Sequence, residues 1–274
     1  MKVMYNDIED YCCRILDQEI DAQELPEGDI YYGDIRTIDD ETLTHYTSWH
    51  LFAGIGGMPY GLRMGGWRDE WSILTAGFPC QPVSNAGKKL AQADPRWLWP
   101  AVVRILHVVR PPIVLLENTP GLLSRGMGDV IRDLAASGYN ARWRVLAAAD
   151  VGAPHLRERV WIVANAQSLG RESWGTESAG LERELCPSGS GGSLANSQCV
   201  GLEESRYGGI SGGKANYVAN PSQWPAEPNV GRVAARVPKR VDRIKALGNA
   251  VVPQVVAALV PWILEGEKGD DYWC

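Results

Sequence analysis

Cys80 stands in the stretch LTAGFPCQPVS, between a proline and a glutamine and directly after an apolar run. A thiol can serve as a packed core group, a disulfide half, a metal ligand or, as the thiolate, a nucleophile. The chain has six cysteines but no CxxC pair, and its four histidines cluster with none of them. This spacing argues against a zinc site or a disulfide framework and favours a reducing cytoplasm. It does not by itself separate a structural thiol from a reactive one.

Other side chains suited to chemistry follow apolar runs. Glu117 comes at the end of PIVLLEN, where a carboxylate at a strand end could exchange protons, although a solvated loop glutamate is equally consistent. Arg157 and Arg159 lie two apart at the start of RVWIVAN, and period-two spacing would send both to one face. Such a pair suits phosphate or base recognition, with a surface salt-bridge pair as the ordinary alternative.

These residues need a scaffold, and the pattern from 48 to about 164 predicts one. The runs WHLFAG, SILTAGF, PIVLLEN and RVWIVAN are typical of buried strands, and GLRMGGW, WPAVVRILHVV and MGDVIRDLAASGY of the helices between them. This alternation predicts an α/β fold with a mostly parallel sheet and helices on both faces. In HLFAGIGG, the glycines after the strand would let the backbone come close to a bound nucleotide. A glycine-rich turn without a binding role is the alternative.

Composition sets outer limits. The chain has 274 residues, 45% hydrophobic, with a formal net charge of −6, which suits a folded domain and leaves room for a local basic groove. The apolar C-terminal run VVPQVVAALVPWIL is short for a membrane span and contains prolines, so we expect no membrane association. Between 166 and 238 apolar periodicity is lost, and a degenerate repeat (ANAQSLGRES, ANSQCVGLEES) appears in Gly/Ser-rich sequence.

The segments FAGIGG, GFPCQPVSNAG, ENTPGLL, RERVW and ALGNAVVP, in this order, resemble the DNA (cytosine-5)-methyltransferase family of bacteria and phages. The resemblance implies the S-adenosyl-L-methionine (SAM)-dependent methyltransferase fold, with a Rossmann-like sheet. It implies a catalytic domain over 1–165, a small target-recognition region over 166–238, and a return to the catalytic domain over 239–274. A monomer acting on double-stranded DNA, without a metal, is the expected form.

The same resemblance assigns roles to the candidate residues. Cys80 would add to C6 of a flipped-out cytosine and so make C5 nucleophilic. Glu117 would hold or protonate N3, Arg159 would fix the carbonyl edge of the base, and Arg157 would lie on phosphate or on Glu117. The methyl group would come from SAM, leaving S-adenosyl-L-homocysteine. Thr119, Val83 and His155 depart from the residues usual in the family, and none of them is a reacting group.

The family's two adenosine-binding units are missing between FAGIGG and GFPCQ. VMYNDIEDYCCRIL and IYYGDIRTID, within residues 1–47, resemble them, which indicates a circular permutation; the alternative is an unrelated N-terminal extension. About ten residues from Ile38 to Ser48 would span about 33 Å, enough for the crossing. The resemblance then predicts a SAM site lined by Asp7, Ile8, Asp34, Ile35, Phe52, Gly54, Gly56, Pro79, Leu98, Asn249 and Ala250.

DNA contacts rest on weaker signals. Six basic residues against one acidic residue lie between 230 and 246, as expected for a phosphate-binding stretch or a solvated helix face. The predicted DNA-binding residues are Gln81, Ser84, Arg96, Arg236, Lys239 and Arg240. Two other functions remain open: an RNA (tRNA) cytosine-5 methyltransferase, and an inactive homologue that binds DNA or regulates.

Overall fold

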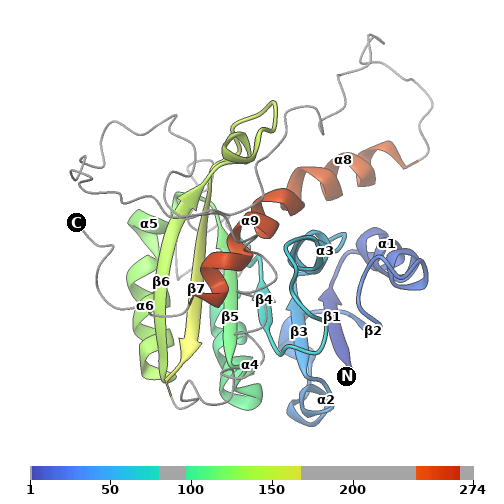
Figure 1. Ribbon diagram of the computed structural model, residues 1–274. Helices are drawn as coiled ribbons and strands as arrows, with labels where there is room; N and C mark the ends of the chain where they lie inside the picture. The colour runs from blue at the N-terminus through green and yellow to red at the C-terminus, as the bar shows by residue number, and fades with distance from the viewer. Residues whose placement is uncertain (1, 80–96, 168–238, 266–274) are drawn as a thin grey trace, which may run out of the picture.

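The computed structural model describes residues 2–79, 97–167 and 239–265. The described chain forms one seven-stranded sheet in the order β2-β1-β3-β4-β5-β7-β6 (Figure 1). The strands are β1 (Val3–Asp7), β2 (Gly28–Tyr32), β3 (Ser48–Leu51), β4 (Leu74–Ala76), β5 (Ile113–Asn118), β6 (Tyr139–Leu146) and β7 (Arg159–Ala166). The first five in spatial order pair in parallel, and β7 pairs antiparallel with both β5 and β6. The predicted mostly parallel sheet is confirmed.

The two N-terminal units are strands of this same sheet. β1 pairs in parallel with β2 on one side and with β3 on the other, with Val3 level with both Gly28 and Ser48. A Cβ on Gly28 would lie 2.2 Å from the carbonyl oxygen of Val3, so only glycine fits at the start of β2. The first 47 residues therefore extend the sheet beyond the strand that leads into the glycine loop.

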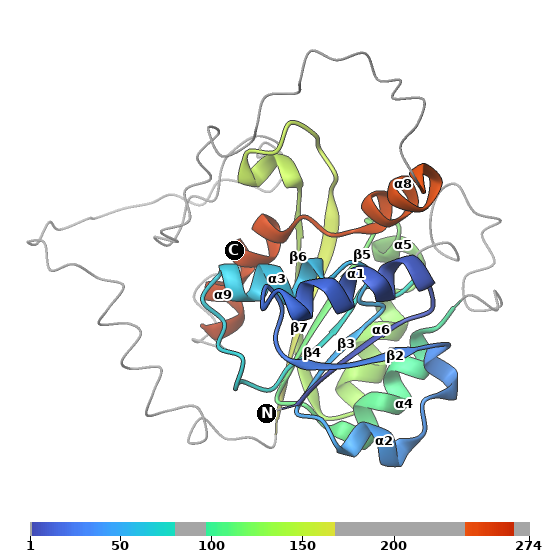
Figure 2. The ribbon, with the colours of Figure 1, turned by 90° about the vertical axis from the view of Figure 1, so that its right-hand side faces the viewer.

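Helices cover both faces of the sheet, as predicted. Figures 1 and 2 show α1, α3 and α9 on one face and α2, α4 and α6 on the other. The helices are α1 (Asp10–Asp21), α2 (Asp40–Thr44), α3 (Gly57–Met64), α4 (Trp99–Val109), α5 (Leu122–Arg125), α6 (Met127–Ala136), α8 (Arg240–Asn249) and α9 (Pro253–Leu264). Single turns of 3-10 helix lie at Ile35–Thr37 and Ala148–Val151.

Helix α4 shows how the sequence pattern produces an element. Trp99, Val102, Ile105 and Leu106 recur at helical spacing and are all buried. Pro100 in the first turn lacks only an N–H that would be unbonded there anyway. The helix ends at Arg110, which adopts a left-handed φ of 43°. The predicted helix WPAVVRILHVV has these same bounds.

Helix α9 packs against α3 through a row of glycines. A Cβ on Gly61 would lie 2.5 Å from the carbonyl oxygen of Pro253, and one on Gly65 would lie 2.5 Å from the side chain of Val260. The spacing of four puts both glycines on one side of α3, so the two helix backbones approach closely. The segment Arg240–Leu264 is apolar and long enough to pass as a membrane span. That composition also suits core helices, and α9 buries seven of its side chains.

Strand β6 was not predicted. Its sequence YNARWRVL alternates large apolar with charged residues, and it forms the edge of the sheet next to β7. The guanidinium groups of Arg142 and Arg144 lie 5.0 and 5.1 Å from the ring centroid of Trp262 on α9. The two arginine side chains thus cover the Trp262 ring, a place where a sequence pattern would lead one to expect hydrophobic residues.

Candidate active site

The carboxyl ends of the parallel strands gather the predicted site residues. Asp7 ends β1, Gly54 follows β3, Pro79 follows β4 and Glu117 lies at the end of β5. Arg159 begins the antiparallel strand β7 and therefore starts at this same edge. Ligands of open α/β sheets bind at this edge, so this is where a site is expected.

Glu117 and Arg159 form an ion pair. Arg159 Nε donates to Glu117 Oε1 at 2.8 Å, and only 13% of the Glu117 side chain and 21% of the Arg159 side chain are exposed. Burial raises the pKa of Glu117 above its ordinary value, although the charges of Arg159 and Arg157 act in the opposite direction. A carboxyl whose pKa is raised keeps its proton to a higher pH than an ordinary carboxyl, which favours a role in proton transfer.

Arg157 is anchored to the C-terminal part of the chain. Its guanidinium donates to the carbonyl oxygen of Gly248 at 3.0 Å through two nitrogens and to that of Ala250. Arg157 precedes β7 and has a left-handed φ of 42°, so the period-two argument does not apply to it. Arg157 and Arg159 nevertheless line one small pocket, together with Trp161 and Val252.

Asp7 and the glycine loop are in direct contact. Asp7 Oδ2 accepts from the backbone N–H of Gly54 at 2.8 Å, and Asp7 Oδ1 accepts from that of Glu9 at 2.9 Å. Burial raises the pKa of Asp7, while these two N–H groups oppose the shift. Gly54 has a left-handed φ of 56°, and a Cβ there would meet no atom within 4 Å. The loop therefore leaves open space beside a carboxylate that its own backbone orients.

The side chains that follow β2, in the second N-terminal unit, are already engaged within the protein. Asp34 Oδ1 and Oδ2 accept from Arg36 Nε at 3.0 and 3.1 Å, and this hydrogen bonding lowers the pKa of Asp34. Ile35 is 2% exposed and belongs to the core cluster, because the 3-10 turn after Asp34 directs it inward. This placement leaves little of the Ile35 side chain for contact with a bound cofactor. Ile8, by contrast, is 59% exposed at the same edge.

The remaining predicted residues lie around this edge or outside the described part of the chain. Phe52 and Gly56 belong to the glycine loop, Leu98 precedes α4, and Asn249 and Ala250 end α8. Lys239 and Arg240 are exposed at the start of α8. Outside the described residues lie the region 168–238 and the predicted site residues Cys80, Gln81, Ser84, Arg96 and Arg236.

Asn118 is a site residue that the sequence analysis missed. Its side chain is 2% exposed, and its Nδ2 donates to the carbonyl oxygen of Phe78 at 3.1 Å. The sequence signal that could have pointed to Asn118 is its position at the end of a strand, directly after Glu117, which follows four buried apolar residues.

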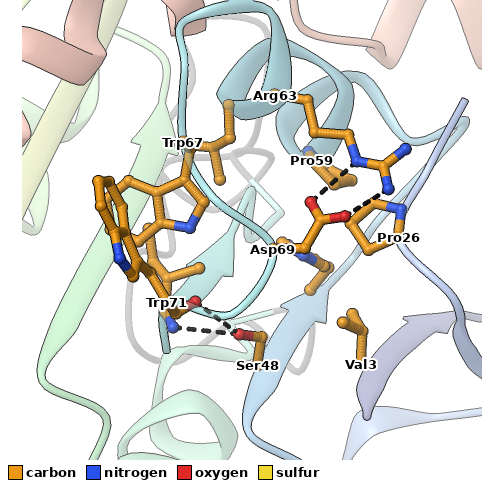
Figure 3. A pocket seen from close by; sticks show the side chains of 11 residues that line it. Val3, Pro26, Ser48, Pro59, Arg63, Trp67, Asp69 and Trp71 are labelled. Atoms are coloured by element: carbon orange, nitrogen blue, oxygen red, sulfur yellow. Dashed lines mark hydrogen bonds and ion pairs between the residues drawn. The ribbon is translucent and has the colours of Figure 1, made fainter. Parts of the chain in front are cut away.

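A small pocket at the opposite edge of the sheet is a separate feature. Figure 3 shows it beneath α3, near the starts of the strands at Val3 and Ser48, with the Arg63–Asp69 ion pair at its rim. His50, which also lines it, is buried, and burial lowers its pKa to about 3. His50 is therefore neutral near physiological pH and, with its hydrogen bond to Thr75, is a core group of the sheet.

The described residues form an α/β fold with a seven-stranded, mostly parallel sheet and a candidate site at its carboxyl edge. Residues 67–187 match the family model described as C-5 cytosine-specific DNA methylase. The type II methyltransferase M.NgoMIV of Neisseria gonorrhoeae is 30% identical over 160 residues, which is 43% of this chain and 51% of that protein. M.MspI of Moraxella sp is 38% identical over 101 residues, 35% of this chain and 24% of that protein.

Solved structures with a similar chain trace include a Spodoptera frugiperda DNMT2 mutant, with a TM-score of 0.39, 18% identity, and coverage of 61% of this chain and 43% of that one. The Entamoeba histolytica methyltransferase EhMeth gives a TM-score of 0.41 and 14% identity, covering 60% and 52%. The family model covers less than half of this chain, and the residues that it matches are similar to C-5 cytosine-specific DNA methylases. The matched regions span about half of M.NgoMIV and about a quarter of M.MspI.

Proposed function

We propose that this protein transfers a methyl group from SAM to C5 of a cytosine in double-stranded DNA. The observation that carries the proposal is the Glu117–Arg159 ion pair at the carboxyl edge of a sheet whose neighbouring strand leads directly into Pro79 and Cys80. The match of residues 67–187 to the family model of C-5 cytosine-specific DNA methylases supports the same reaction. The relatives that match are named type II methyltransferases, which supports DNA as the substrate.

The proposed chemistry begins at Cys80. Cytosine C5 is a poor nucleophile, so the thiolate adds to C6, and the electron pair of the C5–C6 double bond becomes available at C5. C5 takes the methyl group, a base then removes the C5 proton, and the returning electrons expel the Cys80 thiolate to give 5-methylcytosine. The base must leave the helix stack first, at a cost of a few kcal/mol.

Glu117 has the electrostatic properties that this step needs. Charge pushed into the ring accumulates near N3, and a protonated carboxyl there neutralises it. The raised pKa of Glu117 keeps a larger protonated fraction near neutral pH than an ordinary glutamate would have. Arg159 orients this carboxyl through Nε and donates from Nη1 to the carbonyl oxygen of Glu158 at 2.7 Å, and its Nη2 is suited to the carbonyl edge of the base.

The residues around the glycine loop fit a nucleoside-containing cofactor such as SAM, which supplies an electrophilic methyl group when bound. Each oxygen of Asp7 accepts one backbone N–H and keeps a free lone pair for a ribose hydroxyl. Gly54 leaves open space next to this carboxylate, and Ile8 presents exposed apolar surface. Because Asp7 precedes the glycine loop in sequence, the proposal includes a circularly permuted order of the cofactor-binding units.

DNA binding is proposed through α8 and the residues before it. Lys239 and Arg240 are exposed there, at the end of the region 168–238 that would recognise the target sequence. A local excess of basic residues in a protein of net charge −6 would place the DNA backbone on this side of the molecule.

Methyl transfer from tritiated SAM tests the function directly. We expect incorporation into double-stranded DNA and 5-methylcytosine on bisulfite sequencing, with no incorporation into tRNA. Cys80→Ala should bind SAM with unchanged affinity and transfer no methyl group, and the parent protein should form a covalent adduct with DNA containing 5-fluorocytosine. Labelling of tRNA instead of DNA would establish the RNA alternative, and appreciable turnover by Cys80→Ala would exclude the covalent mechanism.

A further inference from the structure

Helix α8 has little apolar contact to hold it in place. Of its ten residues only Ala246 is buried. Its larger apolar side chains, Val241, Ile244 and Leu247, are 78%, 59% and 66% exposed. Most helices are fixed by the burial of an apolar face, and α8 buries almost none of its own against the described residues. Polar contacts must therefore decide where this helix lies.

Arg157 supplies such contacts at the C-terminal end of α8. Its guanidinium donates to the carbonyl oxygen of Gly248 at 3.0 Å through two nitrogens, and also to the carbonyl oxygen of Ala250. The last carbonyls of a helix have no partner within the helix and form the negative end of its dipole, so a cation is favoured there. One side chain thus satisfies two of these carbonyls and holds the point where α8 ends.

Two other contacts involve α8 or the residues that follow it. A Cβ on Gly57, at the start of α3, would lie 2.9 Å from Val251 Cγ2, so the chain after α8 lies directly against α3. Lys245 Nζ lies 2.6 Å from Glu9 Oε1, but these side chains are 55% and 48% exposed. Exposed ion pairs of this kind contribute little. The contacts of Arg157 are therefore the main polar connection between α8 and the rest of the site.

The backbone of Arg157 explains how one short segment reaches both α8 and the acid. Arg157 has a left-handed φ of 42°, which is uncommon for a residue other than glycine and is retained where the surrounding structure requires it. This turn comes just before β7 and frees Arg157 from the alternation of the strand. Its side chain reaches α8, while Arg159, two residues later, pairs with Glu117.

We infer that Arg157 is a positioning residue that fixes α8 relative to the Glu117–Arg159 ion pair. The inference rests on the proposed function, in which α8 binds the DNA backbone and the ion pair holds the target base. A duplex on α8 then presents its base to Glu117 at a distance that the Arg157 contacts determine. An error of about 1 Å between reacting groups can cost about a hundred-fold in rate. The alternative is that Arg157 binds a DNA phosphate.

Two substitutions remove these contacts to different degrees. Arg157→Gln loses the guanidinium, whereas Arg157→Lys keeps the charge but cannot reproduce the planar fork that reaches both carbonyls. Arg110→Gln is the matched control, because Arg110 is an exposed arginine with a φ of 43° at the end of α4, where β5 is about to begin. The control shows the effect of replacing a left-handed arginine that does not touch α8.

Hydrogen exchange of the free protein, read by mass spectrometry, tests the contacts without a substrate. Exchange of the α8 amides should be faster by about ten-fold or more in Arg157→Gln, because losing hydrogen bonds from a charged donor lets the helix open locally. Exchange in α9 should be unchanged. Arg157→Lys should lie between Arg157→Gln and the parent, and it decides the matter if Arg157→Gln does not fold. Parent-like exchange of α8 in these variants, or equally fast exchange in Arg110→Gln, would overturn the inference.

Kinetics and DNA binding separate positioning from a phosphate contact. At saturating SAM and DNA, kcat should fall by about ten- to a hundred-fold in Arg157→Gln and recover in part in Arg157→Lys. DNA affinity should stay within about three-fold of the parent, with the same salt dependence. A phosphate contact would instead weaken DNA binding and lower the slope of log affinity against log salt by about one. That result, or a kcat within about three-fold of the parent, contradicts the positioning role.

The two measurements also distinguish this inference from the proposed function. If the parent transferred no methyl group, the proposed function would fail, and the exchange rates would still decide whether Arg157 fixes α8. A lower kcat without faster exchange in α8 would place Arg157 in direct contact with the base and so reject the positioning role. Arg110→Gln should keep both its kcat and its exchange pattern.

Discussion

Glu117 is placed where two opposing effects act on one carboxyl. Burial at the end of β5 raises its pKa, and the adjacent guanidinium of Arg159 limits that rise. Glu117→Gln keeps an oxygen that can accept from Arg159 but cannot supply a proton. We expect kcat to fall by about a hundred-fold or more while SAM affinity is unchanged, measured by single-turnover methyl transfer and calorimetry. A rate within a few-fold of the parent would mean that Glu117 is not the acid.

The same carboxyl predicts a pH dependence of stability. Because the pKa of Glu117 is higher in the folded than in the unfolded protein, folding favours its protonated form. Its contribution to the free energy of unfolding is therefore full at a pH below the pKa of Glu117 in the unfolded protein. That contribution is lost as the pH rises toward the pKa of Glu117 in the folded protein. The stability of Glu117→Gln relative to the parent should thus increase between these two pH values and then level off. Urea unfolding from pH 4 to 9 measures this, and a flat difference would contradict the raised pKa.

Substitution of Asp7 gives the most specific prediction about SAM binding. Charge-assisted hydrogen bonds to ribose hydroxyls are worth about 1.5–3 kcal/mol each, so Asp7→Ala should weaken SAM binding by about ten-fold to a hundred-fold or more. The loss of the acceptor for Gly54 N–H should add to this effect by loosening the glycine loop. Asp29→Ala, at an exposed carboxylate paired with Lys2, is the control and should leave the affinity unaltered. Equal SAM affinity in both variants by calorimetry would exclude Asp7 from the cofactor site.

At the scale of elements, α8 carries basic residues in two different environments. Lys245 is paired with Glu9 at 2.6 Å and so ties α8 to the N-terminal unit, whereas Lys239 and Arg240 are exposed at the start of the helix. The double change Lys239→Glu and Arg240→Glu should weaken binding to every DNA sequence. Each lost phosphate contact should lower the slope of log affinity against log salt by about one.

A control with one charge reversal, which changes the net charge by half as much as the double change, lies on the opposite face of the sheet. Arg132 on α6 is 67% exposed, and Arg132→Glu should leave DNA affinity and its salt dependence unchanged. Fluorescence anisotropy over a range of salt concentrations measures both. An equal loss of binding free energy per reversed charge in the two proteins would show that net charge, and not α8, governs binding.

At the scale of the whole molecule, the sheet joins segments in an order that differs from the order of the chain. Thr47 contacts both the start of the N-terminal unit and the turn before β4. Its N–H donates to the carbonyl oxygen of Lys2 at 2.9 Å, and its own carbonyl oxygen accepts from Ser72 at 2.5 Å. Ser48 in turn donates to the carbonyl oxygen of Trp71 at 3.2 Å. The start of the N-terminal unit therefore lies close to the turn that enters β4.

This proximity predicts that the units can be rearranged. A chain that begins at residue 48, continues to 71, passes through a short linker into residues 2–46 and resumes at 73 should fold and bind SAM within about three-fold of the parent. Deletion of residues 1–40 should instead give insoluble protein, because it removes β1 and β2 with their buried side chains and leaves β3 as an unpaired edge of the sheet. A soluble, SAM-binding deletion protein would show that the N-terminal unit is an accessory extension.

Local pattern was enough to predict much of this molecule. The helix from Trp99 to Val109, the strand that ends at Glu117 and the strand behind Arg159 each follow from periodicity and length within one short segment. The glycine loop was predicted from the glycines that follow an apolar run, and the two N-terminal strands from their resemblance to the adenosine-binding units of the family. Periodicity is a local property, so a single stretch of sequence carries it.

Contacts between distant segments were decided by the tertiary structure alone. Strand β6 was missed because Trp262, on another element, covers its arginines. Arg157 holds carbonyls 91 and 93 residues further along, and Asn118 reaches back 40 residues to Phe78. A side chain's type limits which bonds it can make, but its partner depends on how the sheet brings strand ends together. The pairing of side chains in the site therefore exists only in the folded chain.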